Sequence, residues 1–209
     1  MYPTFCVSCL NLVSDDVVFC SDCVCKLKSI VSIFVPIIKK KSLKVFAAGS
    51  YQEILKDLVI KKFVRDMIAS KQLGQIITQI VPYEELNVDY IIPIPLHWTR
   101  YAWRGYNQAK IIASVIGNKT KTIVIEPLKR KRRTSFQSKL AFDERKENVK
   151  DVFSIGFWHK NMPVNLNGKK LLLVDDLYTT GATLVSAAKT ILNHANPDSI
   201  SAVVGCRVL

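Results

Sequence analysis

The stretch 171-LLLVDDLYTTGATL-184 decides which fold this chain can adopt. Four apolar residues run into two adjacent aspartates, Asp175 and Asp176, and a threonine-rich turn with one glycine follows. The pattern predicts a buried strand over 170–174 that ends at the acids, and a helix that begins after Gly181. The apolar residues of that helix lie at helical spacing: Leu184, Ala188, Ile191 and Leu192.

Strands and helices alternate along the chain before and after this stretch. Strands are expected over 44–51, 89–95, 122–125 and 199–208, and amphipathic helices over 52–70 and 107–116. This alternation predicts an α/β fold, in which a mostly parallel sheet has helices on both faces. Ligands of such sheets bind at the carboxyl ends of the strands, which is where the two aspartates are expected.

The turn after the aspartates has the composition of an anion site. Backbone N–H groups over 177–183, the hydroxyls of Thr179, Thr180 and Thr183, and the start of the next helix together favour a phosphate. Gly181 lets the backbone approach a ligand, and the carboxylates can accept hydrogen bonds from a diol. A ribose 5-phosphate matches both features. A P-loop is disfavoured because no lysine follows Gly181, and two solvated acids before a capped helix are the plainer alternative.

Four cysteines near the start predict a metal site. Cys6 and Cys9 form one C-x2-C pair, and Cys20 and Cys23 form another after ten intervening residues. Two such pairs can supply four thiolates to one zinc ion in a closed, structural site. A redox role is less consistent with two pairs, and Cys25 is a further candidate ligand.

Length and composition suit a folded protein with one large domain and a small appendage. The chain has 209 residues, of which 49% are hydrophobic. We expect a zinc finger over 1–28, a connector over 29–43 and an α/β domain over 44–209. The first residues do not resemble a signal peptide, and Pro36 interrupts the apolar run 29–38, which is too short for a membrane span. We therefore expect a cytoplasmic protein without a transmembrane segment.

The chain resembles the ComF family of competence proteins, which carry a type I phosphoribosyltransferase domain. Its likeness extends over nearly the whole chain and rests on five features in a fixed order. These are the four cysteines, "KDLVIKKF", "IIPIPLHWTRYAWRGYNQA", "RRTSFQSKLAFDERKENVKDVF" and "LLLVDDLYTTGAT". The last of them is similar to the signature that binds phosphoribosyl pyrophosphate (PRPP) in type I enzymes.

The resemblance implies a role for each part of a PRPP site. Asp175 and Asp176 would bind the ribose hydroxyls, and PRPP would bring Mg²⁺ with its pyrophosphate. Lys61 or Lys62 would meet the pyrophosphate, and the segment 128–149 would close over the site. The residues that would hold the 5-phosphate are Thr179, Thr180, Gly181, Ala182 and Thr183.

Two further motifs of the family have a match here. Arg104, Asn107 and Gln108 match RGxNQ, and we expect Arg104 and Lys62 to assist catalysis if transfer occurs. A helix start capped by Asn107 is the alternative reading of that motif. Arg145 and Asn148 match the R-x2-N of the closing loop, for which ordinary surface polarity is an equal alternative.

The formal net charge of +13 exceeds what a PRPP site needs. Five consecutive basic residues form Lys129–Arg133, and Arg130, Arg132 and Arg133 are candidate contacts to nucleic acid. Aromatic residues nearby could stack with unpaired bases, so single-stranded DNA is the expected partner. These rings are Trp98, Tyr101, Trp103 and Tyr106.

Two functions are consistent with the sequence. The first is a PRPP-binding protein that acts in natural transformation, binds incoming single-stranded DNA and has partners in the competence machinery. The second is an active phosphoribosyltransferase of nucleotide metabolism without a role in DNA uptake. The sequence does not identify the acceptor of such a transfer.

Overall fold

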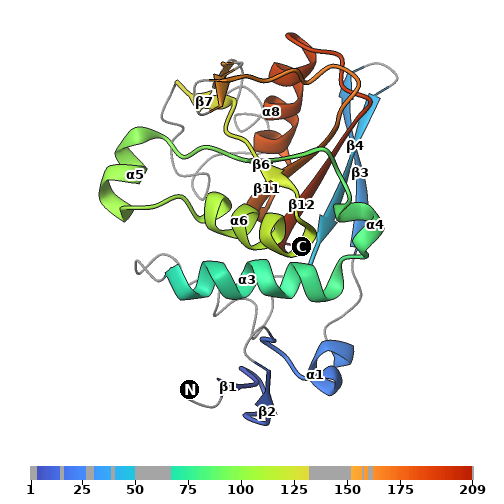
Figure 1. The fold of residues 1–209 in the computed structure, drawn as a ribbon, viewed down its shortest axis with the longest axis vertical. Coiled ribbons are helices and arrows are strands. Elements are labelled where there is room, and N and C mark those ends of the chain that lie inside the picture. Colours follow the sequence, from blue (N-terminus) through green and yellow to red (C-terminus); the bar gives the residue numbers. More distant parts are fainter. Residues whose placement is uncertain are drawn as a thin grey trace.

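A six-stranded mixed sheet forms the centre of the fold, with the strand order β3-β4-β12-β11-β5-β6 (Figure 1). β3 pairs with β4 antiparallel, and the other neighbouring strands pair in parallel. The strands are β3 (Val31–Ile38), β4 (Lys41–Ala47), β5 (Tyr90–Pro93), β6 (Ile123–Val124), β11 (Lys170–Tyr178) and β12 (Ser199–Arg207). The computed structural model describes residues 4–14, 17–26, 31–38, 41–49, 67–131, 152–156, 158–159 and 162–208.

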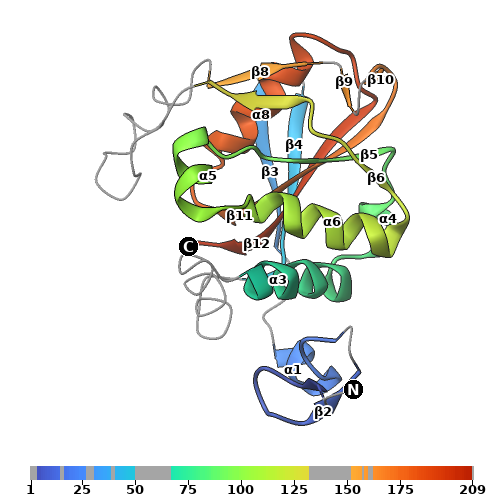
Figure 2. The ribbon, with the colours of Figure 1, turned by 60° about the vertical axis from the view of Figure 1, so that its left-hand side comes forward.

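Helices cover both faces of this sheet, which confirms the predicted α/β architecture (Figures 1 and 2). One face packs against α3 (Met67–Ile80) and α6 (Gln108–Thr120), and the other packs against α8 (Ala182–Leu192). Alternate side chains of β11 point to opposite faces of the sheet. Leu172 and Val174 belong to the hydrophobic cluster that contains α3 and α6, while Leu171 and Leu173 belong to the cluster that contains α8.

Shorter elements surround the sheet. β7 (Leu128–Arg130) pairs with β8 (Phe153–Ile155), and β9 (Trp158–His159) pairs with β10 (Met162–Pro163). Two short helices, α4 (Tyr83–Leu86) and α5 (Trp98–Arg104), precede β5 and α6 respectively. Within the described ranges, every helix is too short or too polar to cross a bilayer.

The cysteine-rich segment packs against α3. It consists of β1 (Thr4–Phe5), β2 (Leu12–Val13) and α1 (Ser21–Lys26), at the lower end of the molecule in Figure 1. Phe19 is 1% exposed and belongs to the same hydrophobic cluster as the buried side chains of α3. Gln79 of α3 also donates a hydrogen bond to the Phe19 carbonyl, at 3.5 Å. In the described residues, the small segment therefore packs on the same hydrophobic cluster as α3.

The structure differs from the sequence-based expectation at the amino-terminal edge of the sheet. The segment 29–43 was expected to be a connector, yet most of it forms β3 and the start of β4. Ile33, Val35 and Ile37 alternate inward toward the α8 side, a pattern that Pro36 obscured in the sequence. Proline is tolerated here because β3 is an edge strand and its register shifts between Pro36 and Ile38.

Other predicted elements are present with different limits. The strand expected over 44–51 is β4, which begins and ends earlier, and the helix expected over 107–116 is α6. Most of the helix expected over 52–70 lies outside the described residues, although its last four residues begin α3. The strands expected over 89–95, 122–125 and 199–208 correspond to β5, β6 and β12.

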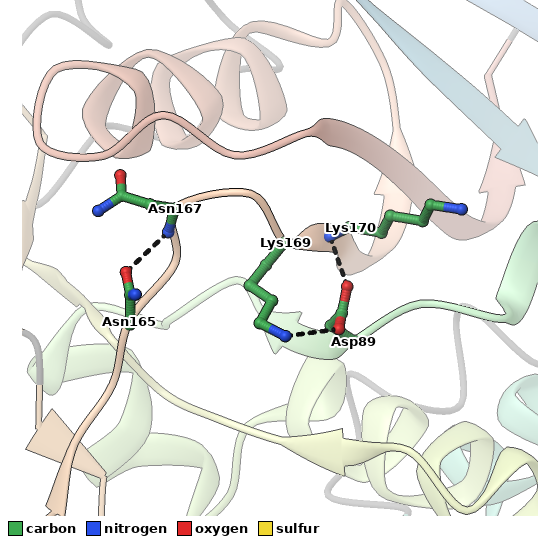
Figure 3. Close-up of polar contacts among 5 residues, drawn as sticks. All are labelled: Asp89, Asn165, Asn167, Lys169 and Lys170. Carbon is green, nitrogen blue, oxygen red and sulfur yellow. Dashed lines mark hydrogen bonds and ion pairs between the residues drawn. The ribbon is translucent and has the colours of Figure 1, made fainter.

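A carboxylate at the amino end of the sheet fixes the register of β5 against β11. Asp89 accepts hydrogen bonds from the Lys169 ammonium at 3.0 Å and from the Lys170 backbone N–H at 2.8 Å (Figure 3). Next to them, the Asn167 backbone N–H donates to the Asn165 side chain. The backbone hydrogen bond from Lys170, followed by the bond from Lys169, lowers the pKa of Asp89. Ionised Asp89 therefore stabilises the pairing that positions the opposite end of β11.

We expect Asp89→Asn to lower the free energy of unfolding at pH 7 by about 0.5–1 kcal/mol, because it removes a charged acceptor that is partly screened by solvent. Since the folded-state pKa lies below the unfolded value of 3.8, this contribution is present above that pH and is lost on further acidification. Urea unfolding over a pH series should show the difference from wild type shrinking toward pH 3. Asp198→Asn, an exposed acid on the same edge, is the matched control. If the difference in unfolding free energy between Asp89→Asn and wild type did not change with pH, the stabilising role of ionised Asp89 would be contradicted.

Candidate functional site

The two aspartates lie where β11 continues past the end of one neighbouring strand. β5 pairs with β11 as far as the Pro93–Val174 pair, and Ile94 then donates a last backbone hydrogen bond to Val174. On its other side, β11 stays paired with β12 as far as Tyr178. The strand predicted to end at Val174 is thus longer, because β12 continues to supply its hydrogen bonds. Asp175 and Asp176 lie on the stretch that has lost β5.

The ladder is irregular at the acid pair. Asp175 pairs with Val204 and Leu177 pairs with Cys206, but the Asp176–Gly205 pair is absent from the described register. The alternation of faces also reverses there, since Leu177 joins the α3–α6 cluster and Tyr178 joins the α8 cluster. The Asp175–Val204 and Leu177–Cys206 pairs keep the same offset, so the change of face occurs without an inserted residue.

Gly205 allows the close backbone approach at this irregularity. A Cβ atom added there would lie 3.0 Å from the carbonyl oxygen of Asp176 and 3.1 Å from Leu73 of α3. Asp175 is fixed from the other direction, because its Oδ1 accepts a hydrogen bond from the Asp176 N–H at 2.9 Å. Both Asp175 and Asp176 are half-buried.

The threonine-rich turn connects β11 to α8 beside the acids. Gly181 has a φ of 74°, a left-handed conformation that few side chains adopt, and a Cβ there would lie 2.8 Å from the Tyr178 ring. The Thr180 hydroxyl accepts a hydrogen bond from the Ala182 N–H at 3.4 Å. The structure therefore brings the turn, the acids and the amino end of an eleven-residue helix together at one edge. Such a helix end attracts anions.

A basic side chain from β7, Arg130, is close enough to Asp175 for the two charges to interact. The guanidinium of Arg130 lies over the Phe153 ring, with 5.6 Å between its Cζ and the ring centroid. Burial, and then the positive charge of Arg100, lower the pKa of Arg130, while the Asp175 carboxylate opposes that effect. Arg130 is half-buried and Lys129 is exposed. The basic run that was expected to be a loop thus begins as a strand with alternating faces.

The RGxNQ motif forms the junction between α5 and α6. Gly105 ends α5 with a φ of 83°, and Asn107 caps α6 by accepting a hydrogen bond from the Ala109 N–H. Asn107 also donates to the Ile94 carbonyl at 3.0 Å, which joins α6 to the end of β5. The capping interpretation of Asn107 is therefore confirmed, and the catalytic role of Arg104 stays a prediction. Arg104 itself is buried, with its Cζ 6.0 Å from the Trp103 ring centroid.

Gln108 is a buried polar residue at the start of α6. Its side chain is 1% exposed, and neither its oxygen nor its nitrogen has a hydrogen-bond partner in the described part of the chain. An unpaired buried amide is costly in a folded protein and commonly marks a position that a ligand or water satisfies. The sequence identified Gln108 only through its motif, because burial of this residue depends on the packing of α6 on the sheet.

The four cysteines of the two C-x2-C pairs meet in space. The Sγ atoms of Cys6, Cys9, Cys20 and Cys23 all lie within 4.8 Å of one another, so this group could hold a metal ion. Turns position them: the Leu10 N–H donates to the Cys6 carbonyl, and the Val24 N–H donates to the Cys20 carbonyl. Cys25 is exposed on α1 and is not part of this cluster.

The local environment shifts the pKa values of the Cys6 and Cys9 thiols in opposite directions. Burial disfavours the Cys6 thiolate, but backbone hydrogen bonds from Cys9 and Cys20 help to outweigh it, and the pKa of Cys6 is lowered to about 6. A backbone hydrogen bond at Asn11 favours the Cys9 thiolate, yet desolvation and the other thiols raise the pKa of Cys9 to about 12. Four thiolates so close together need a cation, which a bound metal ion provides.

Several predicted site residues lie outside the described residues. These are Lys61, Lys62, Arg132, Arg133, Arg145 and Asn148, together with most of the segment 128–149 that was expected to close over the site. Their roles stay predictions. The described part adds two basic residues near the acids and the turn that the sequence did not assign there, namely Arg130 and Arg207. Arg207 lies with its Cζ 6.0 Å from the centroid of the Tyr178 ring.

Comparisons with known proteins agree with this arrangement. Residues 102–208 match the family model described as "Phosphoribosyl transferase domain". The chain is 33% identical to "Competence protein F" of Haemophilus influenzae and 29% identical to "Competence protein ComFC" of Bacillus subtilis, over 47% and 53% of its own length. It is 32% identical to "DNA utilization protein YhgH" of Escherichia coli K12 over 51% of its length. The matched parts span 42%, 41% and 44% of these relatives, which is less than half of each.

Gly205→Ala should destabilise the protein by about 1–3 kcal/mol, because its Cβ would press against the Asp176 carbonyl and Leu73 in a packed region. Gly156→Ala is the matched control, since no described residue other than its chain neighbours has an atom within 4 Å of the added Cβ, and its backbone is not left-handed. Urea unfolding of both variants checks this. Equal stability of the two variants would contradict the close packing described for Gly205.

Proposed function

Because the chain belongs to the phosphoribosyl transferase domain family, we propose that it binds PRPP and acts in DNA uptake during natural transformation. The observation that carries the proposal is the acid pair followed by the threonine-rich turn, at the carboxyl end of the central strand β11. A sugar diol and a phosphate on the same ligand match these two groups.

Each described part of the site has a proposed role. Asp175 and Asp176 accept hydrogen bonds from the ribose hydroxyls, and the turn over 179–183 holds the 5-phosphate at the amino end of α8. Half-buried carboxylates beside a pyrophosphate also suit Mg²⁺, which prefers oxygen ligands and substrate phosphates. Bound Mg²⁺ would neutralise pyrophosphate charge. Lys61 and Lys62 are proposed to contact that pyrophosphate.

Transfer of the ribose is the second candidate function, and the family match favours it. In such a reaction a nucleophile forms a bond to the ribose C1 and pyrophosphate leaves with the bonding electrons. Lys62 and Arg104 are proposed to stabilise the leaving pyrophosphate. Release of pyrophosphate from PRPP in the presence of an acceptor would separate this function from binding alone.

The role in DNA uptake rests on relatives and on charge. The relatives are named as competence and DNA utilization proteins, and the chain carries a net charge of +13. We propose that Arg130, Arg132 and Arg133 lie along the phosphates of single-stranded DNA in the cytoplasm, where proteins of the competence machinery are further partners. Arg130 would share its charge between the DNA and Asp175.

The cysteine cluster is proposed to hold a structural zinc ion. Four thiol ligands within 4.8 Å leave no open coordination position for catalysis. Because Cys6 and Cys23 belong to the same hydrophobic cluster as α3, metal binding would stabilise the segment where it packs on the rest of the protein.

Isothermal titration of PRPP with Mg²⁺ tests the main proposal. The double variant Asp175→Ala/Asp176→Ala should bind PRPP at least about 100-fold more weakly, because both acceptors of the ribose hydroxyls are lost. The loss of two hydrogen bonds to charged groups accounts for a change of that size. Asp198→Asn, at the opposite edge of the sheet, should bind as the wild type does.

An unfolding curve of each variant controls for loss of fold. Similar affinity in the wild type and the folded double variant would overturn the proposed ribose contacts. Absence of PRPP binding by the wild type would overturn the PRPP proposal as a whole.

Elemental analysis tests the zinc site. The purified protein should contain about one zinc ion per chain, and Cys6→Ser or Cys23→Ser should lose it because a closed site needs all four thiolates. Cys25→Ser should retain the metal, since Cys25 lies outside the cluster. Zinc loss in the Cys25 variant alone would refute the ligand set.

A further inference from the structure

A groove with a volume of about 780 Å³ lies beside the acid pair but is built from other elements. Its walls come from the loop after β5, from α5, from the solvent side of α6 and from β7. α5 projects from the sheet next to the start of α6 in both views (Figures 1 and 2). None of the residues assigned above to the ribose or to the 5-phosphate lines it.

Large aromatic side chains stand exposed on α5. Trp98 is 71% exposed and Tyr101 is 53% exposed, and both line the groove together with Tyr106. Trp103, on the same helix but outside the groove, is 58% exposed. Scattered apolar residues are ordinary on a surface, but a concentration of rings at one groove marks an interaction site.

The short helix that carries these rings is held at both ends. His97 caps its start, with a ring nitrogen 2.9 Å from the Thr99 hydroxyl, and Gly105 ends it in a left-handed conformation. Arg104 anchors the last turn because it is buried. The rings are therefore presented on a preorganised support, which lowers the entropic cost of binding.

The charges of the groove select the chemistry of its ligand. Among the described residues that line it, Lys71, Lys110, Lys129 and Arg130 are basic and Glu126 is acidic. Lys110 pairs with Glu126 at 2.6 Å, and the described lining as a whole carries more positive than negative charge. A polyanion with flat apolar faces complements such a surface better than an apolar peptide does.

We propose that this groove is a stacking surface for unpaired bases of single-stranded nucleic acid, with Trp98 and Tyr101 as the stacking rings. The inference rests on the proposed role in DNA uptake and assigns that role to a surface distinct from the acid pair. Bases of a duplex have their faces covered by their neighbours, whereas the bases of a single strand can stack on aromatic side chains. The lysines lie along the rim, where they meet the phosphates.

Arg130 connects the groove to the PRPP site. It lines the groove, and its charge interacts with that of Asp175 on β11. The two ligands would thus bind side by side on different residues. Single-strand binding should consequently survive loss of the acid pair, and PRPP binding should survive loss of the rings.

Fluorescence anisotropy with a labelled oligothymidylate of about 20 nucleotides tests this surface. Trp98→Ala/Tyr101→Ala should weaken binding about 10-fold or more, since two stacked bases lose their platforms. Phe34→Ala is the matched control, because Phe34 is an exposed aromatic residue on β3 that does not line the groove. Its affinity should equal that of the wild type. Trp98→Phe should bind the oligonucleotide more tightly than Trp98→Ala/Tyr101→Ala does, because an aromatic ring remains at position 98. A loss of affinity caused by misfolding would not be recovered by keeping a ring.

The outcomes separate this inference from the proposed function. If the wild type binds the oligonucleotide and the double variant binds it equally well, the groove is not the base-stacking surface, while the proposal of DNA binding stands. If the wild type binds duplex as tightly as single strand, stacking is overturned. If it binds no oligonucleotide, both the groove and the DNA role fail, and the PRPP titration still decides the acid site by itself.

Discussion

The end of β5 at Pro93 is the constraint on which the site depends. Because β5 stops there, β11 continues for four residues beyond the Val174 pair with hydrogen bonds to β12 alone. A central strand that loses one neighbour leaves backbone groups and side chains accessible in the middle of a sheet, and both acids are half-buried there. Asp175 and Asp176 occupy this position, where the Asp176–Gly205 pair is absent from the described register.

The opposite end of the sheet fixes this geometry. Asp89 joins the start of β5 to the start of β11 and so fixes the register of these two strands at their amino ends. That register determines where Asp175 and Asp176 lie at the other end of β11. Asn107 has a similar role at the carboxyl end, where its hydrogen bond to the Ile94 carbonyl connects α6 to the residue after β5. Short polar contacts of this kind define alignment, while the two hydrophobic clusters supply most of the stability.

α3 links the three parts of the molecule. Its Leu73 contacts the region of Gly205, its buried face joins the cluster that contains Cys6 and Phe19, and it packs in parallel with α6. Lys71 on the same helix lines the aromatic groove. The cysteine-rich segment, the region of the acid pair and the groove therefore all contact α3, although their proposed ligands differ in chemistry.

The sequence by itself predicted the class of fold, the acid pair with its threonine-rich turn, and the cysteine cluster. Periodicity predicted β5, α6, β11 and α8, because their apolar residues repeat at the period of a strand or a helix. The spacing of the cysteines predicted a metal cluster, since a C-x2-C turn directs two thiols to one point without help from the rest of the chain.

Only the tertiary structure decided which residues meet. β3 was hidden by Pro36, whose tolerance depends on its place at the sheet edge, and the length of β11 depends on β12. Arg130 was predicted to contact nucleic acid as part of a basic run, and only the structure shows that it lies on β7, half-buried, with its guanidinium over the Phe153 ring. The groove joins Trp98 to Lys71 and Lys129, which are far apart in sequence. Such contacts arise from long-range packing, and a pattern read along one segment does not contain them.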